Sequence, residues 1–256
     1  MGNAAAVQGR VVHALILREI SARFGQTYFG YIWALFNPAA GIIVLTLIFS
    51  VAERFSPPDI PLLMFVVTGY LTWQCFQNAY DKTQSATGAS QALLHFPHVT
   101  GLDLVVARAM LEIMTYTAIL GIFTAVGLLL TDNAWPDRPR LALVAFWYAG
   151  LGGTVLGAFV GALSPVMRSL NNFVSPVLRF GFFTSGIFFT ATQLPSWVLP
   201  YLSWNPMFHV IERVRETWFA GYISPIAEEA FVLRLLLFGL AAALLAERVS
   251  RRWQGQ

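Results

Sequence analysis

Six long apolar segments constrain the fold of this chain more than any other feature. They cover residues 33–52, 60–80, 104–130, 141–163, 173–194 and 230–247. A helix needs ~20 mostly apolar residues to cross the ~30 Å hydrocarbon core of a bilayer. Charged residues make up only 11% of the chain, whereas soluble domains carry roughly 25%. The sequence therefore predicts an all-α polytopic membrane protein with six transmembrane helices, and it excludes a soluble globular domain.

Two segments depart from this pattern. Residues 1–32 are predicted to form a cytoplasmic or interfacial region, and residues 33–256 the transmembrane domain. Within the first, residues 7–30 show apolar positions near helical spacing, interrupted by charges. This predicts an amphipathic helix that lies in the membrane interface or packs on another protein. Residues 195–229 are rich in aromatic residues and proline, and their two apolar pieces are too short to cross. They predict a re-entrant segment between spans five and six.

The distribution of Lys and Arg indicates the orientation of the chain. An even number of spans places both termini on one side of the membrane. Nine Lys or Arg residues flank that side and six flank the other. Positive residues concentrate in cytoplasmic loops, so both termini are predicted to be cytoplasmic.

The sequence lacks the motifs of several enzyme and cofactor classes. No GxxxxGK[ST] phosphate loop is present, and Lys82 stands without the required glycines, so ATP is not expected to bind this chain. His95 and His98 have no carboxylate or thiol clustered with them, and no metal site is predicted. Cys75 is the single cysteine, which excludes a disulfide framework. The sequence has no basic stripe interleaved with aromatic residues, so nucleic-acid binding is not predicted.

Two charged residues lie inside predicted spans. Glu112 in span three and Arg179 in span five each fall ~9–12 Å below the cytoplasmic ends at 1.5 Å per residue. Charges in lipid are costly and are usually paired or functional, so the sequence predicts a Glu112–Arg179 pair that fixes helix packing. Arg108, four residues before Glu112, is an alternative partner. A role of these two charges in coupling transport to proton movement is the less favoured interpretation.

A membrane enzyme that acts on a lipid-linked sugar is the main alternative from another class. It would need a carboxylate pair or a metal cluster near one membrane face. The only candidates are Glu212 with Glu216, and Glu228 with Glu229. Both pairs are predicted to lie on solvated faces.

Aromatic residues are unusually dense in the first, second and fifth spans. Aromatic faces stack on the apolar faces of sugars, and such residues could line a path for a glycan; packing between helices is the alternative use. The predicted channel residues are Tyr28, Tyr31, Trp33, Tyr70, Trp73, Phe76, Phe182, Phe183 and Phe188.

Four stretches of this sequence match a known pattern. They are Arg18-Glu19-Ile20 with Arg23-Phe24-Gly25 and Gly30-Tyr31-Ile32-Trp33; Phe96-Pro97-His98-Val99 before Leu102-Asp103; Ser175-Pro176 with Ser185-Gly186-Ile187-Phe188-Phe189; and Trp204-Asn205-Pro206-Met207. The chain resembles the membrane subunits of type-2 ABC exporters over nearly its whole length. Within them it is most similar to capsular polysaccharide export permeases. Exporters of O-antigen and teichoic acid show a similar pattern.

The resemblance implies a multi-pass permease of the bacterial inner membrane, and not an enzyme. It implies a homodimer with two separate cytoplasmic ABC ATPase subunits that bind ATP and Mg. It further implies a lipid-linked polysaccharide as substrate, and periplasmic and outer-membrane capsule export proteins as partners. Residues 81–103 match the coupling region of the family. The residues predicted to contact the ATPase are Arg18, Arg23, Phe96, His98, Asp103 and Arg168.

Overall fold

The computed structural model describes residues 2–24, 29–52, 60–86, 100–131, 134–167 and 169–254. Within these ranges the chain forms nine α-helices and one short 3-10 helix, with no strand. The elements are α1 (Gly2–Phe24), α2 (Phe29–Ala52), α3 (Leu62–Gln84), α5 (Gly101–Leu130), α6 (Pro139–Leu163), α7 (Leu170–Thr184), η2 (Ala191–Gln193), α8 (Leu199–Leu202), α9 (Pro206–Trp218) and α10 (Glu229–Gln254). The predicted all-α class is confirmed.

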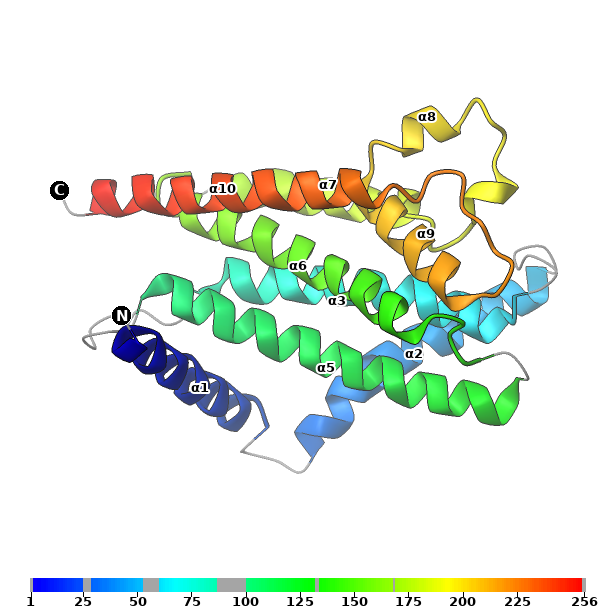
Figure 1. Cartoon of the computed structure of the whole chain (residues 1–256), viewed down its shortest axis with the longest axis horizontal. Helices are drawn as coiled ribbons and strands as arrows, with labels where there is room; N and C mark the ends of the chain where they lie inside the picture. Colours follow the sequence, from blue (N-terminus) through cyan, green and yellow to red (C-terminus); the bar gives the residue numbers. More distant parts are fainter. Residues whose placement is uncertain are drawn as a thin grey trace.

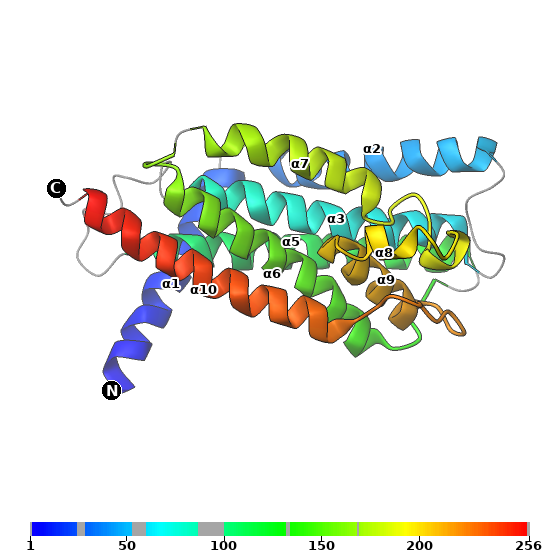
Figure 2. The same cartoon turned by 90° about the horizontal axis from the view of Figure 1, so that it is seen from above.

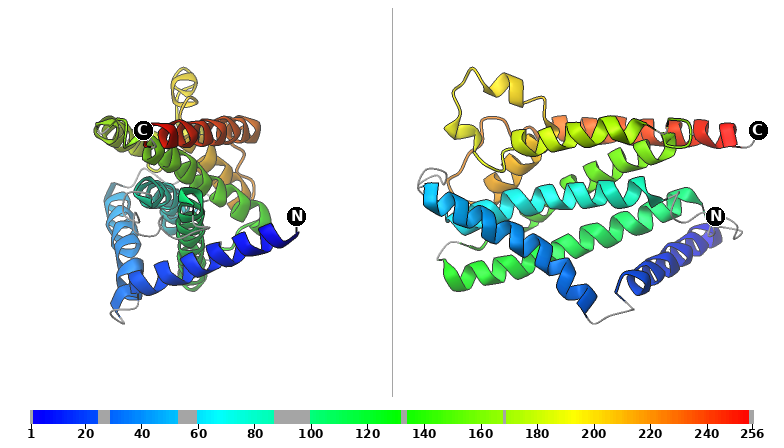
Figure 3. Two further views of the ribbon diagram at one scale, coloured as in Figure 1. Left: turned by 90° about the vertical axis from the view of Figure 1, so that its left-hand side faces the viewer. Right: turned by 180° about the vertical axis from the view of Figure 1, so that it is seen from behind.

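The long helices form one elongated bundle around α3 (Figure 1). Seen end-on, α3 lies among α2, α5 and α6 (Figure 3), and it contacts all three. The helix α1 crosses α5 at the end of the bundle that also holds the C-terminus. The segment with η2, α8 and α9 lies at the opposite end (Figure 2).

Three of the described helices are long and apolar enough to cross a bilayer. They are α5, α6 and residues 229–250 of α10, and a shorter apolar helix covers residues 35–51. The outward faces of α5 and α10 expose large apolar side chains such as Leu129, Leu237 and Phe238, as expected for contact with lipid. The structure is that of a polytopic membrane protein; the number of six spans remains a prediction.

A row of glycines brings α6 into backbone contact with α3. Gly153, Gly157 and Gly161 recur every four residues on one face of α6. A methyl group at Gly153 would lie 2.0 Å from the carbonyl oxygen of Phe76, and one at Gly161 would lie 2.6 Å from that of Gln84. Small residues at this spacing let membrane helices approach closely. At Gly153 and Gly161, α6 therefore lies directly against the backbone of α3.

The fifth predicted span is wrong in its extent. The span was expected over residues 173–194, but α7 ends at Thr184. Gly186 follows with a φ of +84°, a backbone conformation that favours glycine and turns the chain away from the helix axis. At 1.5 Å per residue, the 15 residues of α7 extend ~22 Å, which is short of the ~30 Å hydrocarbon core.

The N-terminal helix packs against its own chain. It covers Gly2–Phe24 instead of the predicted 7–30. Leu15 of α1 is buried in a small cluster with Leu104 and Val105 of α5. The predicted coupling region begins as the last turn of α3 and ends as the first turn of α5, and residues 87–99 between them lie outside the described residues.

Candidate functional site

A groove between α3 and α7 gathers aromatic and polar side chains. Its volume is about 500 Å³, and it is lined by Trp73, Gln77, Asp81, Ser175, Leu178, Arg179, Phe182 and Phe183. Three of these aromatic residues are predicted channel residues. The combination of ring faces with an amide, a carboxylate, a guanidinium and a hydroxyl can contact both the apolar and the hydroxyl faces of a sugar.

The rings along this groove form one connected cluster. The ring centroids of Trp73 and Phe182 are 5.7 Å apart in an edge-on arrangement, and those of Trp73 and Phe76 are 5.3 Å apart. The ring of Phe188 stacks on Phe183 at 5.7 Å, and it meets the edge of Phe182 at 5.3 Å. Five of the nine predicted channel residues are therefore brought together, although they come from α3, α7 and the turn after α7.

Of the other predicted channel residues, only the side chain of Tyr70 is described. The hydroxyl of Tyr70 accepts a hydrogen bond from Gln74 at 3.1 Å and packs closely against Gly41 of α2, so it does not line the groove. Tyr31 and Trp33 belong to the first turns of α2, and Tyr28 lies outside the described residues.

Polar contacts cluster toward the end of the groove where α3 ends. The amide of Gln77 donates to both carboxylate oxygens of Asp81 at 3.3 Å. The hydroxyl of Tyr80 donates to the side-chain oxygen of Asn171 at 2.8 Å, which ties the end of α3 to the start of α7. The guanidinium of Arg179 is exposed along this groove.

The structure does not bring Glu112 and Arg179 together. Glu112 is only 2% exposed within α5, whereas Arg179 is exposed on α7. The helix α3 lies between α5 and α7 (Figure 2). Spacing along each span placed both charges at one depth, but it carried no information on which helices are neighbours.

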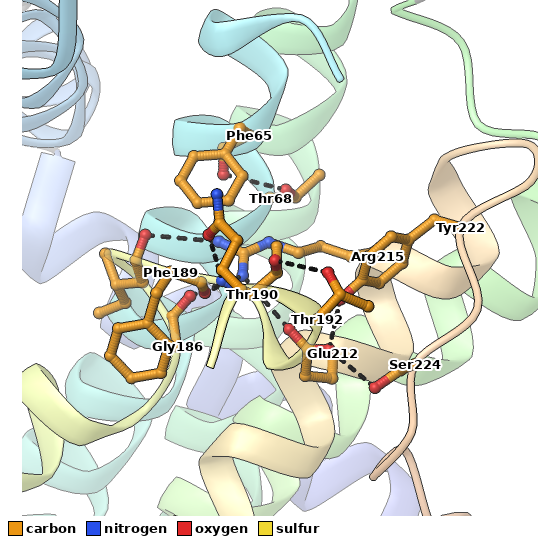
Figure 4. Close-up of polar contacts among 12 residues, drawn as sticks. Phe65, Thr68, Gly186, Phe189, Thr190, Thr192, Glu212, Arg215, Tyr222 and Ser224 are labelled. Carbon is orange, nitrogen blue, oxygen red and sulfur yellow. Dashed lines mark hydrogen bonds and ion pairs between the residues drawn. The ribbon is translucent and has the colours of Figure 1, made fainter. Parts of the chain in front are cut away.

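A fully buried arginine on α9 holds the turn after α7 (Figure 4). The guanidinium of Arg215 donates to the carbonyl oxygens of Gly186 at 2.6 Å, Phe189 at 2.8 Å and Ile187 at 3.4 Å. It also lies 4.0 Å from the ring centroid of Phe65 on α3, a favourable cation–π geometry. Carbonyl groups of unwound backbone need partners where water is excluded, and Arg215 supplies them with its fixed fork of donors.

Glu212 is buried, which corrects the prediction of a solvated face. Its side chain is 0% exposed and forms an ion pair with Arg215 at 3.5 Å. The hydroxyls of Tyr222 and Ser224 donate to the same carboxylate at 2.6 and 2.7 Å (Figure 4). Burial, together with this carboxylate, raises the pKa of Tyr222, so its hydroxyl stays protonated and remains a donor.

The other carboxylates considered for an enzyme are also held in ion pairs. Arg213 bridges Glu216 at 2.8 Å and Glu229 at 3.1 Å, and Arg234 pairs with Glu228 at 2.6 Å. In the part of the chain that the structure describes, no three His, Cys, Asp or Glu side chains gather as metal ligands would. These groups brace α9 and α10 against each other.

Arg215 links the outer segment to the aromatic cluster. The turn whose carbonyls it binds carries Phe188, so the arginine fixes the position of that ring. A methyl group at Gly69 would lie 2.8 Å from the guanidinium, which shows that α3 leaves room for it. The sequence held a signal for this role, because Arg215 follows Phe208 by seven residues and Ile211 by four. All three lie on one buried face of α9.

The predicted ATPase-contacting residues are described in part. Asp103 accepts hydrogen bonds from the backbone N–H and hydroxyl of Thr100, both at 2.8 Å, and from the Gln8 amide of α1. It therefore caps α5 and joins it to α1. Arg18 is exposed on α1, and Arg23 belongs to its last turn. Phe96, His98 and Arg168 lie outside the described residues.

A second contact joins α1 to α5 nearby. The guanidinium of Arg108 lies 3.1 Å from the carboxylate of Glu19 and donates to the carbonyl of Lys82 at 3.2 Å. Three helices, α1, α3 and α5, therefore meet at the end of the bundle where residues 81–103 begin and end.

Comparison with known proteins identifies the family of this chain. Residues 10–219 match the family model of the ABC-2 type transporter. The polysialic acid transport protein KpsM of Escherichia coli is 32% identical over 246 residues, covering 92% of this chain and 93% of that protein. The capsule polysaccharide export inner-membrane protein BexB of Haemophilus influenzae is 29% identical over 92% of this chain and 90% of its own length. The O-antigen export system permease protein RfbA of Klebsiella pneumoniae is 24% identical over 88% of this chain and 87% of its own length. The chain belongs to the ABC-2 type transporter family of membrane permeases.

Proposed function

We propose that this chain is the permease subunit of an ATP-driven exporter that moves a lipid-linked capsular polysaccharide across the bacterial inner membrane. Membership of the ABC-2 family and the named functions of the most similar relatives support the transport role. The observation that carries the proposal furthest is the α3–α7 groove. It combines a connected cluster of rings with polar groups at one end, as a path for a glycan requires.

The proposed assembly contains two copies of this chain. Within a single chain the groove is open, and α7 leaves Phe173, Val177 and Phe183 exposed. A second copy facing α7 would close the groove and complete the path. Separate ATPase subunits would bind ATP and Mg, since this chain has no phosphate-binding loop.

The proposed contact with the ATPase lies where α1, α3 and α5 meet. With both termini in the cytoplasm, residues 81–103 and 164–172 face the ATPase. Movement of this end would be transmitted along α3 to the groove. Periplasmic and outer-membrane capsule export proteins would receive the polysaccharide at the other end, where the predicted re-entrant segment lies.

Removing one ring of the groove should slow export. Phe183→Ala deletes the ring that stacks on Phe188. A stacking face worth about 1 kcal/mol corresponds to an about fivefold lower rate. Surface capsule, measured per assembled complex, should fall by this factor. Phe180→Ala is the matched control, because Phe180 is similarly exposed on α7 but lines a different cavity. Equal effects of the two substitutions would remove the groove from the path.

Reversing the charge at Asp103 should uncouple ATP hydrolysis from export. In Asp103→Arg the bonds to Thr100 and Gln8 are lost, and a positive charge stands at the positive end of α5. We expect export to cease while the complex still hydrolyses ATP. Asp103→Asn retains an acceptor oxygen for the cap and is expected to export normally. Unchanged export in Asp103→Arg would show that this region does not couple.

Two experiments test the proposed function as a whole. Deleting the gene should leave capsular polysaccharide inside the cell. In the complemented strain, a tagged copy of the permease should co-purify with an ATPase. If O-antigen or teichoic acid accumulates instead, the substrate assignment is wrong and the transport assignment stands. If no ATPase co-purifies and no glycan accumulates, the transport assignment itself fails.

A further inference from the structure

A second and larger cavity lies on the other side of α7. Its volume is about 790 Å³, and it is lined by residues of α3, α6, α7, α8, α9 and α10. Its walls are almost entirely apolar, with Leu156 and Phe159 from α6, Val177 and Phe180 from α7, and Leu235 and Leu236 from α10. Trp73 and Leu178 line both this cavity and the aromatic groove. They form the wall that separates the two.

The length of this apolar cavity matches one leaflet of a bilayer. Along α10 its lining runs from Val232 to Ala242, a distance of ~15 Å at 1.5 Å per residue. Along α6 it runs from Tyr148 to Phe159, or ~16 Å. Half of the ~30 Å hydrocarbon core is ~15 Å. The cavity is therefore as long as one extended acyl chain in its leaflet.

Polar groups stand at one end of the cavity only. Tyr201, Trp204 and Asn205 lie at this end, and the side chains of Tyr201 and Trp204 are 77% and 83% exposed. Tyr and Trp are enriched at the headgroup level of membranes. The side-chain amide of Asn205 donates to the hydroxyl of Thr184 at 3.0 Å. The hydroxyl of Tyr148 donates to Glu229 at 2.7 Å.

We propose that this cavity binds one acyl chain of a membrane phospholipid, from the leaflet on the side of α8, with its headgroup beside Tyr201 and Trp204. The walls include two of the helices that are long and apolar enough to span, and the outward face of α10 is apolar as well. The cavity is therefore bordered by helices that face hydrocarbon, where phospholipid chains are the most abundant ligand. An apolar cavity does not hold ordered water, and a sugar would find no hydroxyl partners along its walls. The site does not depend on what the groove transports.

Gly152 provides a direct test of occupancy. A methyl group at this position would have Phe76 at 3.7 Å and Leu236 at 4.0 Å as its nearest neighbours, so a larger side chain can extend into the cavity. Gly152→Phe should fill the space that the acyl chain takes. Gly121→Phe is the matched control, because Gly121 is exposed on α5 and a methyl group there meets nothing within 4 Å.

The probe is phosphatidylethanolamine with a diazirine on one acyl chain, in nanodiscs that hold the full chain. After irradiation, peptides are mapped by mass spectrometry. In the wild type and in Gly121→Phe, labelling should concentrate on cavity-lining residues of α6, α7 and α10. In Gly152→Phe it should fall to the level of the outward apolar faces. If Gly152→Phe does not fold, Leu236→Trp fills the cavity from the opposite wall, and the same loss is expected.

Two outcomes would overturn the proposal. Labelling of the cavity residues that is equal in the wild type and in a folded filled variant would show that no chain enters. A diazirine-bearing polyprenyl phosphate that labels these residues in preference to phosphatidylethanolamine would assign the cavity to an isoprenoid carrier and not to a bilayer phospholipid.

Discussion

Arg215→Met is expected to destabilise the protein by about 3–5 kcal/mol, the cost of breaking a buried ion pair on one side. Methionine fills part of the space but donates no hydrogen bond to the three carbonyls after α7. It also leaves the buried carboxylate of Glu212 without its cation. The chain should be recovered in low yield and should elute as aggregate when solubilised in mild detergent. The measurement is the fraction of monodisperse protein and its midpoint of thermal unfolding.

Arg213→Met is the matched control for this substitution. Arg213 lies two residues earlier on the same helix and also pairs with carboxylates, but its side chain is 26% exposed. Partly exposed pairs contribute about 0–1 kcal/mol, so this variant should remain folded. Arg215→Lys keeps the charge but lacks the planar fork, and it should fall between the two. Equal stability of Arg215→Met and Arg213→Met would show that the buried network does not hold the turn.

Gly153→Val is the second substitution expected to have a large effect. A side chain at Gly153 would overlap the backbone of α3, since its first carbon would lie 2.0 Å from the carbonyl oxygen of Phe76. Backbone cannot move aside as a flexible side chain can, so α3 and α6 must separate. Overpacking commonly costs about 1–3 kcal/mol and occasionally more, and a contact with backbone belongs to the upper end. We expect little folded protein.

Gly121→Val provides the comparison for Gly153→Val. Both variants place the same branched side chain in a helix interior, but Gly121 meets nothing within 4 Å. The comparison therefore cancels the helix propensity of valine and leaves the contact with α3. Thermal unfolding of the two purified variants gives the difference. Similar midpoints would mean that α6 does not pack on α3 through this glycine.

Local sequence patterns predicted several of these features. Trp204-Asn205-Pro206-Met207 belongs to the exporter pattern, and in the structure Asn205 caps α9 through its bond to the Met207 N–H at 3.0 Å. The second of the two short apolar pieces expected within residues 195–229 forms α9, and its residues Phe208, Ile211 and Val214 are buried. The density of rings predicted a channel lining that includes Trp73, Phe182 and Phe183, and the structure brings these three rings into one cluster. Each of these depends on residues close together in the sequence or on composition.

Features that depend on contacts between distant segments were not predicted. The apolar run of the fifth segment continues past Thr184, so hydropathy did not reveal the end of α7. Glu212 was predicted to lie on a solvated face. It is buried because its partner Arg215 is enclosed by the turn at residues 186–189 and by Phe65, which come from other elements. The contact of α6 with α3 requires knowing which face of each helix meets the other. Neighbour relations also decided against the Glu112–Arg179 pair.

The glycine contact between α3 and α6 has a consequence for which parts of the molecule can move. Two helices whose backbones touch cannot slide past each other without steric overlap, so α3 and α6 form a rigid pair. In α7, by contrast, Leu178 is the one buried side chain, and Leu170, Val174 and Phe182 pack only partly buried against the core. Their burial contributes a few kcal/mol. A difference of a few kcal/mol is within the range by which ligands redistribute conformations. The helix that can move at the lowest cost in free energy is therefore α7, which separates the aromatic groove from the apolar cavity.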